Sequence, residues 1–172
     1  MTNEELDLLL VLVLAVLLIG LMAWGWRRRV KRDAKLTAPT GDIPAGARIL
    51  ASFPALYVAT TARGTALNRL AVRGLAFRAR ATVIVTDAGL ALDLAGEDRV
   101  FVAADRLVAV DQATVTIDRV VEPDGLTRLS WRIDEDTVVD SYLRPQDASA
   151  RALAAGIEPL LSAPVTPTGT DA

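Results

Sequence analysis

The hydrophobic pattern begins with an uninterrupted apolar run of nineteen residues, from Leu8 to Trp26. A helix of this length extends about 28 Å at 1.5 Å per residue, which is close to the thickness of about 30 Å of a bilayer's hydrocarbon core. The run is apolar on every side, so it has no polar stripe to face water while another face packs on a protein core. The pattern predicts a membrane-spanning helix over residues 8–26.

Short β-type runs dominate the middle of the chain. The turn Asp87-Ala88-Gly89 separates two of them and predicts a hairpin. We expect the run over 126–133 to pair with the run before it, and we leave Ala66–Arg73 open between a strand and a short helix. The expected strands cover residues 56–61, 80–86, 90–94, 99–103, 107–111, 114–121, 126–133 and 137–143.

The period then changes to that of a helix. Pro145 is suited to the first turn of a helix, where its missing N–H has no partner in any case. Leu153, Ile157, Leu160 and Leu161 recur on one helical face. The pattern therefore predicts a mainly-β domain, a bent antiparallel sheet or partial barrel (or β-sandwich) of seven to eight strands, capped by a C-terminal helix.

These patterns divide the chain into five parts. We expect a short extracytoplasmic N-terminus, a transmembrane helix, a basic juxtamembrane segment with a linker, a folded domain and a disordered tail rich in Pro and Thr. The expected bounds are, in that order, 1–7, 8–26, 27–46, 47–163 and 164–172.

The charges that flank the apolar run predict its orientation. Glu4, Glu5 and Asp7 precede it, and five bases follow within six residues. Basic residues stay on the cytoplasmic side of a span, and tryptophans prefer the membrane interface. The N-terminus should therefore lie outside the cell membrane and the domain in the cytoplasm, with the single span in a bacterial inner membrane. The orienting residues are Trp24, Trp26, Arg27, Arg28, Arg29, Lys31 and Arg32.

A cleavable signal peptide is a weaker interpretation of the same run. A signal peptide begins with basic residues and has a shorter apolar core and a small-residue cleavage site. Here the start is acidic and the run ends in Ala23-Trp24-Gly25-Trp26 followed by arginines. The pattern favours a retained anchor.

The net charge of −2 conceals a strong asymmetry. Residues 27–80 contain twelve bases and two acids, whereas residues 87–172 contain seven bases and sixteen acids. Two interpretations stay open for the arginines of the basic half. They contact anionic lipid headgroups or a partner, or they pair with distal acids such as Asp93, Asp118 and Asp140. The arginines concerned are Arg63, Arg69, Arg73, Arg78 and Arg80.

The residues offer little catalytic chemistry. The chain has no His and no Cys, which removes the commonest general base, the commonest zinc ligand and any disulfide or thiolate site. No serine lies in GxSxG or SxxK, and neither a P-loop nor GxGxxG occurs. The turn Asp134-Glu135-Asp136 lacks the spaced ligands of a calcium loop. The acidic distal half disfavours nucleic-acid binding. We expect no catalytic residue, no metal, no cofactor and no nucleic-acid partner.

Several short motifs carry a resemblance to a known family. The chain resembles the actinobacterial small membrane proteins that join one N-terminal span to a cytoplasmic pleckstrin-homology-like domain, and the likeness covers nearly the whole chain. It implies that fold and a membrane location, but no established chemistry. The motifs are Arg27-Arg28-Arg29, Tyr57-Val58-Ala59-Thr60-Thr61, Arg80-Ala81-Thr82, Thr86-Asp87-Ala88-Gly89, Trp131-Arg132 and Arg144-Pro145.

The expected function is accordingly that of a non-enzymatic interaction or scaffold module, held at the inner face of the membrane and binding a protein partner. The bilayer is its other expected partner, since a tether raises the local concentration of whatever the domain binds. The alternative is an accessory subunit of an export or transport complex, with the helix packed against other spans.

Overall fold

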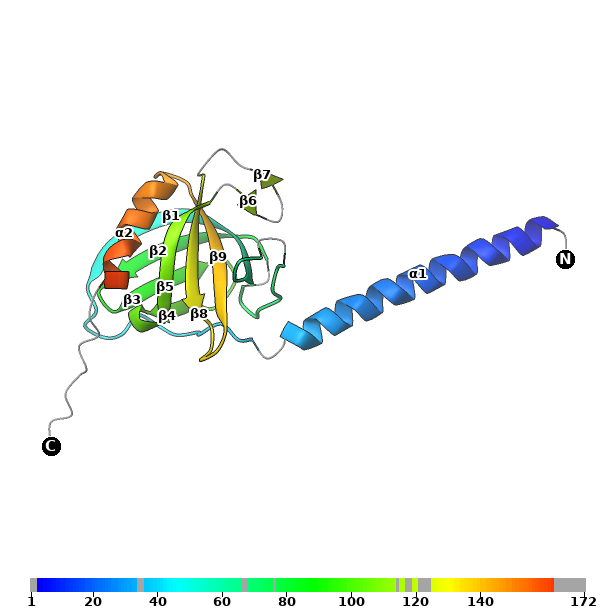
Figure 1. Cartoon of the computed structure of the whole chain (residues 1–172), viewed down its shortest axis with the longest axis horizontal. Helices are drawn as coiled ribbons and strands as arrows, with labels where there is room; N and C mark the ends of the chain where they lie inside the picture. Colours follow the sequence, from blue (N-terminus) through cyan, green and yellow to red (C-terminus); the bar gives the residue numbers. More distant parts are fainter. Residues whose placement is uncertain are drawn as a thin grey trace, which may run out of the picture. The chain divides into compact units, whose positions relative to one another are not determined.

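The computed structural model describes two units, one helical and one mainly β (Figure 1). The described residues are 3–33, 36–65, 68–75, 77–113, 115–116, 119–120 and 125–162. The first unit is the helix α1 (Asn3–Asp33). The second contains β1 (Ile49–Ala62), β2 (Ala79–Thr86), β3 (Gly89–Leu94), β4 (Val100–Ala103), the 3-10 helix η1 (Ala104–Arg106), β5 (Leu107–Ala113), β6 (Val115–Thr116), β7 (Arg119–Val120), β8 (Leu126–Arg132), β9 (Val138–Pro145) and α2 (Ala150–Ser162).

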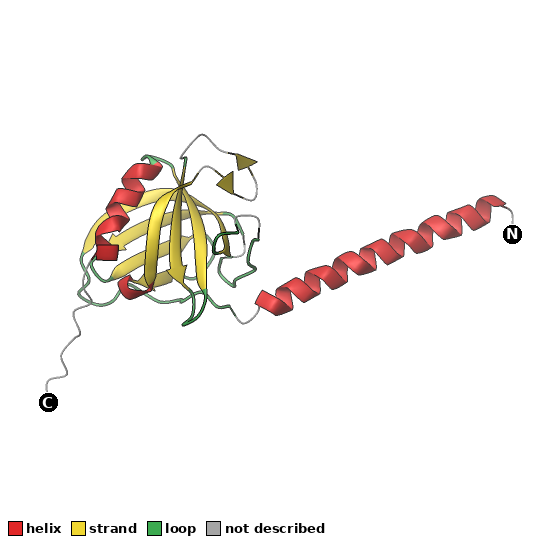
Figure 2. Ribbon diagram, in the orientation of Figure 1, coloured by secondary structure: helices red, strands yellow, loops and turns green. Residues whose placement is uncertain are grey.

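Seven of the strands form one open sheet in the order β4-β3-β2-β1-β9-β8-β5, and β6 and β7 pair separately. Every neighbouring pair in the sheet is antiparallel. Figure 2 shows the sheet as a curved layer with α2 at one side. The expectation of an apolar N-terminal helix and a bent antiparallel sheet capped by a C-terminal helix is confirmed.

One side of the sheet, the inner face, builds the hydrophobic core. Alternate residues of β1 and β2, such as Ala55, Tyr57 and Val83, are buried there. The side chains between them point to the opposite side, the outer face, since successive residues of a strand alternate. Leu153 and Ile157 of α2 are fully buried against the inner face, as their spacing predicts.

A chain of buried hydroxyls crosses this core. The Tyr57 hydroxyl lies 2.8 Å from both Leu75 O and Thr60 Oγ1. Because a carbonyl only accepts, Tyr57 donates to Leu75 O and Thr60 donates to Tyr57. Ser141 Oγ lies 2.7 Å from Thr60 Oγ1 and accepts from Trp131 Nε1 at 2.9 Å. This row of hydrogen bonds fixes the segment at Leu75 to β1. Burial raises the pKa of the Tyr57 phenol above its ordinary range.

The hairpin of β2 and β3 forms where the sequence predicts it. Gly89 has a φ of +153°, and a Cβ there would lie 2.3 Å from the backbone oxygen of Val102. Thr86 Oγ1 donates to Gly89 O and accepts from Gly89 N. No residue other than glycine fits this position beside β4 without a shift of the backbone.

The predicted helix start at Pro145 is wrong. Pro145 is the last residue of β9 and pairs with Ala55, whereas α2 begins at Ala150. Ser149 caps the helix instead, because its Oγ accepts the N–H of Ala152 and its carbonyl accepts that of Leu153, each at 3.1 Å. The serine oxygen accepts an N–H of the first turn that has no partner within the helix. Pro145 lies too far upstream to belong to that turn.

Two strand predictions also differ from the structure. β8 pairs with β5 and β9, and not with the run over 114–121. The described parts of that run form the short β6–β7 pair. β1 begins at Ile49, seven residues before the expected strand, and continues through Pro54. The open segment Ala66–Arg73 contains, in its described part, only isolated bridges at Arg69 and Arg73.

The segment 36–41, expected to belong to a linker, contacts the domain. Ala38 is 2% exposed within the core. Pro39 O accepts the N–H of Phe101 at 2.9 Å, and Gly41 donates to Arg99 O at 3.1 Å. Thr37 forms a bridge with Arg73. These bonds cover the outer edge of β4, which would otherwise present unpaired backbone groups.

Candidate functional site

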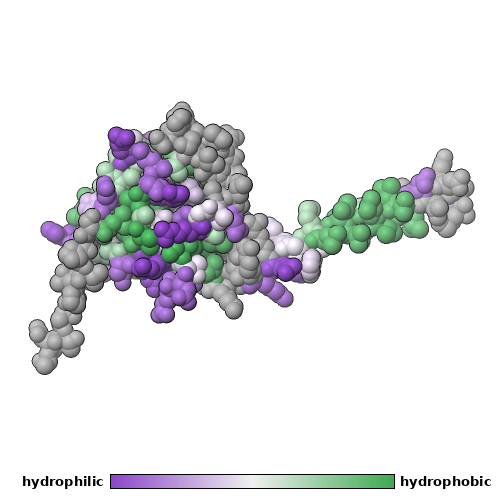
Figure 3. Space-filling model, viewed as in Figure 1, coloured by the Kyte–Doolittle hydropathy of each residue, from purple (hydrophilic) through white to green (hydrophobic). Residues whose placement is uncertain are grey.

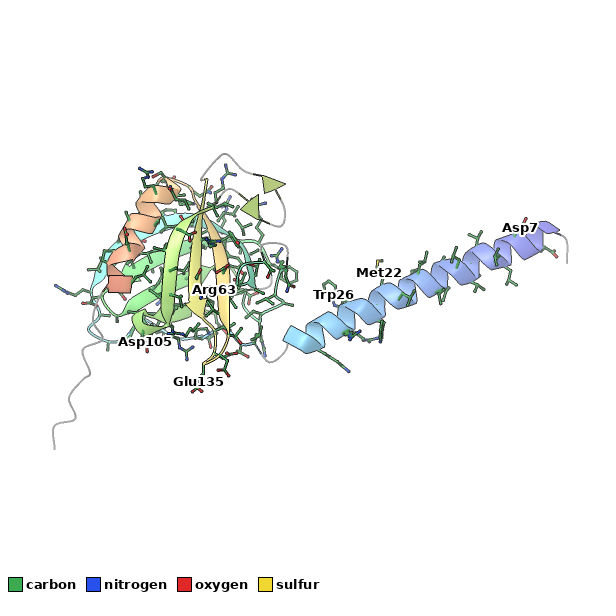
Figure 4. All side chains as sticks on the ribbon, in the orientation of Figure 1. Asp7, Met22, Trp26, Arg63, Asp105 and Glu135 are labelled. Carbon is green, nitrogen blue, oxygen red and sulfur yellow. The ribbon has the colours of Figure 1, made fainter. Side chains whose placement is uncertain are left out.

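The first candidate surface is the apolar stretch of α1, which has no polar face. The window Leu9–Arg28 has a mean hydropathy of 2.6, and none of it is buried against the rest of the protein. Figure 3 shows α1 green over most of its length and purple toward its ends, and Figure 4 labels Asp7, Met22 and Trp26 along it. By length and composition the helix is able to cross a membrane.

The basic end of α1 has a local contact as well. The Arg28 guanidinium carbon lies 5.7 Å from the centre of the Trp24 ring, one helical turn earlier. This is a cation–π distance. Trp24, Trp26, Arg27, Arg28 and Lys31 are exposed, whereas the side chains of Arg29 and Arg32 lie outside the described part.

The second candidate surface is a groove on the outer face of the sheet, of about 580 Å³. Leu56 lies between Arg80 of β2 and Arg144 of β9 in the strand register, so the three side chains share the outer face. Both arginines are exposed. The groove is lined by Pro54, Ala55, Leu56, Arg80, Ala81, Thr82, Asp93, Leu94, Ala95 and Gln146.

The carboxylate that lines this groove, Asp93, is already paired with another group. Arg99 binds Asp93 through two nitrogens, one of them Nη2 at 2.9 Å from Oδ2, and also lies 3.5 Å from Asp42. Arg80 forms no ion pair with the described residues. The groove is therefore cationic at Arg80 and apolar at Leu56, and Arg144 lies beside Leu56 in the neighbouring strand.

The interpretation that the basic-half arginines pair with distal acids holds for Arg48, whose Nε donates to Asp87 Oδ2 at 3.1 Å, but it is wrong for Asp93 and Asp140. Asp93 is bound by Arg99, and Asp140 by Ser130 and the backbone N–H of Gly64. Asp118 lies outside the described residues. The bond to Asp93 raises the pKa of Arg99, and the bond to Asp111 raises that of Arg128 in the same way.

The structure does not bring the five arginines of the sequence prediction into one site. Arg69 is partly buried, and its Nη2 donates to Val58 O at 3.3 Å, beside the irregular register between Tyr57 and Ala59 of β1. Arg63 lies in an exposed turn after β1. Arg69 thus supports the backbone of the domain, and whether the others contact a lipid or a partner stays a prediction.

The remaining two arginines flank a feature that the sequence prediction missed. Arg73 and Arg78 are exposed on either side of Phe77, whose side chain is 72% exposed. An aromatic residue beside an arginine outside any periodic run is a signal that the sequence offers. No sequence signal indicates the groove, because Leu56 and Arg144 become neighbours only through the pairing of β1 with β9.

The acidic turn behaves as a turn. Asp134 Oδ1 accepts the backbone N–H groups of Asp136 and Thr137, and the hydrogen bonds with Thr137 lower the pKa of Asp134. Figure 4 shows Glu135 at the tip between β8 and β9. Among the described residues no group of acids is placed to hold a metal ion.

Comparisons with known proteins identify the domain. The model of a family described as "Bacterial PH domain-like" matches residues 36–156, which is more than half of the chain. No curated protein matches the chain. A similar solved structure is the crystal structure of the C-terminal domain of an unknown protein from Leishmania infantum, with a TM-score of 0.44 and 12% identity over 82% of this chain and 99% of that one.

Proposed function

This chain belongs to the bacterial PH domain-like family, and we propose that it is a membrane-anchored, non-enzymatic interaction module whose groove contacts a protein partner. The family supports the coarser statement, that the domain is a protein or lipid interaction module. The anchor, its orientation and the kind of partner belong to the proposal.

The observation that carries the proposal is the contrast in burial between the two units. The twenty-residue window Leu9–Arg28, apolar except for its last two residues, is not buried within the protein. Exposing such a surface to water costs about 25 cal/mol for each Å² of apolar area, and a bilayer removes that cost. The domain from Leu36 onward has its own core and needs no such partner.

The chemistry of the groove supports a protein partner with an acidic segment. Leu56 offers an apolar contact, and the two arginines beside it offer planar donors that fit carboxylates. Backbone groups of the partner would find Gln146 and Thr82 at the same surface.

Membrane fractionation tests the anchor. The full chain should stay with the membrane after alkaline extraction, and a variant with Leu14→Arg and Leu17→Arg should be released, because each arginine near the centre of a span costs about 3 kcal/mol. The matched control is Ile49→Arg with Leu50→Arg, because these two residues are similarly exposed but lie in the domain. Release of the wild-type chain would refute the anchor.

Photo-crosslinking in cells tests the groove. A crosslinker at Leu56 should capture a protein, and Arg80→Glu should reduce the capture, whereas a crosslinker at Glu135 should be unaffected by Arg80→Glu. Capture of a polytopic membrane protein would favour the alternative, an accessory subunit of an export or transport complex. Equal capture from both positions would contradict a role for the groove.

A further inference from the structure

Phe77 is the most exposed large hydrophobic side chain among the described residues of the domain. Its exposure is 72%, compared with 62% for Ile49 and 53% for Leu50. Among the other aromatic rings of the domain, those of Tyr57, Tyr142 and Trp131 are almost completely buried and those of Phe53 and Phe101 are partly buried. A single exposed apolar side chain is common on a protein surface, but an aromatic ring this exposed is able to bury a large apolar area in a contact.

The loop that carries Phe77 is held firmly at its base. Leu75 is fully buried, its N–H donates to Val72 O at 3.0 Å, and its carbonyl accepts the Tyr57 hydroxyl. On the other side the chain enters β2 at Ala79. Phe77 therefore lies two residues from an anchored position on each side. We call residues 73–75 and 77–78 the Phe77 loop.

Positive charge flanks the ring. Arg73 and Arg78 are exposed, and neither forms an ion pair with a carboxylate in the described part of the chain. An aromatic ring beside free guanidinium groups has the chemistry of a membrane interface, where rings prefer the headgroup level and arginines bind phosphates.

The covalent path to α1 limits how far this loop lies from the end of the helix. Arg73 forms a bridge with Thr37, which is only four residues beyond Asp33, the last residue of α1. Four extended residues span at most about 14 Å. The apolar window ends at Arg28, and the five helical residues from there to Asp33 add about 8 Å. Thr37 is thus tethered within roughly 22 Å of the end of the apolar window, whatever the orientation of the domain, and Arg73 lies beside Thr37 across the bridge.

We propose that the Phe77 loop docks on the anionic bilayer surface, with the Phe77 ring in the interfacial zone and Arg73 and Arg78 on lipid phosphates. This inference rests on the proposed membrane anchor. It adds a second membrane contact, which orients the domain and leaves the groove beside Arg80 for the protein partner. Arg69 has no part in it, since its guanidinium is directed to Val58 O.

The absence of cysteine from the natural sequence makes a direct test available. The full-length protein carries one nitroxide label, through Phe77→Cys, Ile49→Cys or Leu17→Cys, in nanodiscs of phosphatidylcholine with or without phosphatidylglycerol. Collisions with oxygen, which partitions into lipid, and with a water-soluble nickel complex report the depth of each label. Ile49 is the matched control, because the strand β1 carries it about 26 Å from the residue that pairs with Ala79.

The account predicts that the label at 77 shows a severalfold higher oxygen-to-nickel ratio than the label at 49 in anionic nanodiscs. The ratio should fall to that of position 49 in 1 M salt, where screening acts over about 3 Å, and also with Arg73→Gln and Arg78→Gln. The nanodiscs contain only lipid and the same scaffold protein with and without phosphatidylglycerol, so a cellular protein partner cannot produce this result.

Three results would overturn parts of the account. A label at 77 that is as water-exposed as the label at 49, with the label at Leu17 in the bilayer, refutes the Phe77 loop contact and leaves the anchor intact. A water-exposed label at Leu17 refutes the anchor itself. Equal immersion of positions 77 and 49 would also refute a contact specific to this loop.

Discussion

α1 and α2 are both rich in aliphatic residues, yet their surroundings are opposite. The apolar window of α1 is unburied, whereas Leu153, Ile157 and Leu160 of α2 are at most 5% exposed. In α2 the apolar side chains recur on one face, and in α1 they surround the axis. The distribution of apolar residues around a helix, and not their number, indicates whether the helix belongs to a protein core.

Charging each helix should separate these roles with the largest effect. Ile157→Asp places a carboxylate at a fully buried position without a counter-charge and should lower the free energy of unfolding by about 4 kcal/mol or more. Leu17→Asp should leave the unfolding of the domain unchanged and weaken membrane retention. Denaturant titration of the full chain in detergent, followed by near-ultraviolet circular dichroism, measures the first.

The matched control is Ala155→Asp, which places the same charge on the exposed side of α2. It should change the unfolding free energy by less than about 1 kcal/mol. Equal losses from Ile157→Asp and Ala155→Asp would contradict the packing of α2 on the sheet.

Removing one hydroxyl from the buried row of hydrogen bonds should lower the free energy of unfolding by a smaller amount. This row lies in the core of the domain, and α1 has no counterpart to it among its described residues. Tyr57→Phe leaves Leu75 O without its donor and should cost about 1–3 kcal/mol. Tyr142→Phe is the control, because its hydroxyl makes no hydrogen bond among the described residues although its ring is buried. Thermal or denaturant unfolding of both variants compares them, and a larger loss from Tyr142→Phe would refute the role of the chain.

The smallest effect distinguishes an arginine that supports the domain from one on its surface. Arg69→Gln should cost about 1–2 kcal/mol, since it removes a charged donor from Val58 O. Arg80→Gln should change the unfolding free energy by less than about 0.5 kcal/mol, because the side chain is exposed. The same denaturant titration measures both, and the reverse order would place Arg69 on the surface and Arg80 in a supporting position.

Local features of the sequence predicted local parts of the fold. The β2–β3 hairpin follows from a turn whose glycine is required by its contact with Val102, and α2 follows from its period. Pairing between distant strands was less accessible. β5 and β8 are neighbours although a separate strand pair lies between them in the chain, and no local pattern encodes that register.

Proline had a misleading local meaning. Pro145 suggested the start of a helix, and Pro54 lies outside the expected strand over 56–61, yet both prolines lie in paired strands. They meet where β9 ends, so Pro54 O accepts the N–H of Gln146 at 2.9 Å. A proline is tolerated in a strand at such a position, where no ladder bond is lost, but only the tertiary structure reveals it.

The candidate sites were predictable in part. Flanking charge and length indicated the surface of α1, and the basic half of the chain was evident from the residue counts. The sequence did not indicate that one arginine binds a backbone carbonyl, another lines the groove and others lie in a loop. Each depends on what lies across the sheet, such as Arg144 opposite Leu56.

The orientation of the anchored chain is the central claim, and labelling of single cysteines in intact cells tests it most directly. Glu5→Cys precedes the span, and Glu135→Cys lies at the exposed turn between β8 and β9. The account predicts that a membrane-impermeant maleimide labels position 5 in intact cells and position 135 only after lysis, because five bases follow the span and three acids precede it. Labelling of position 135 in intact cells would place the domain outside and contradict the account.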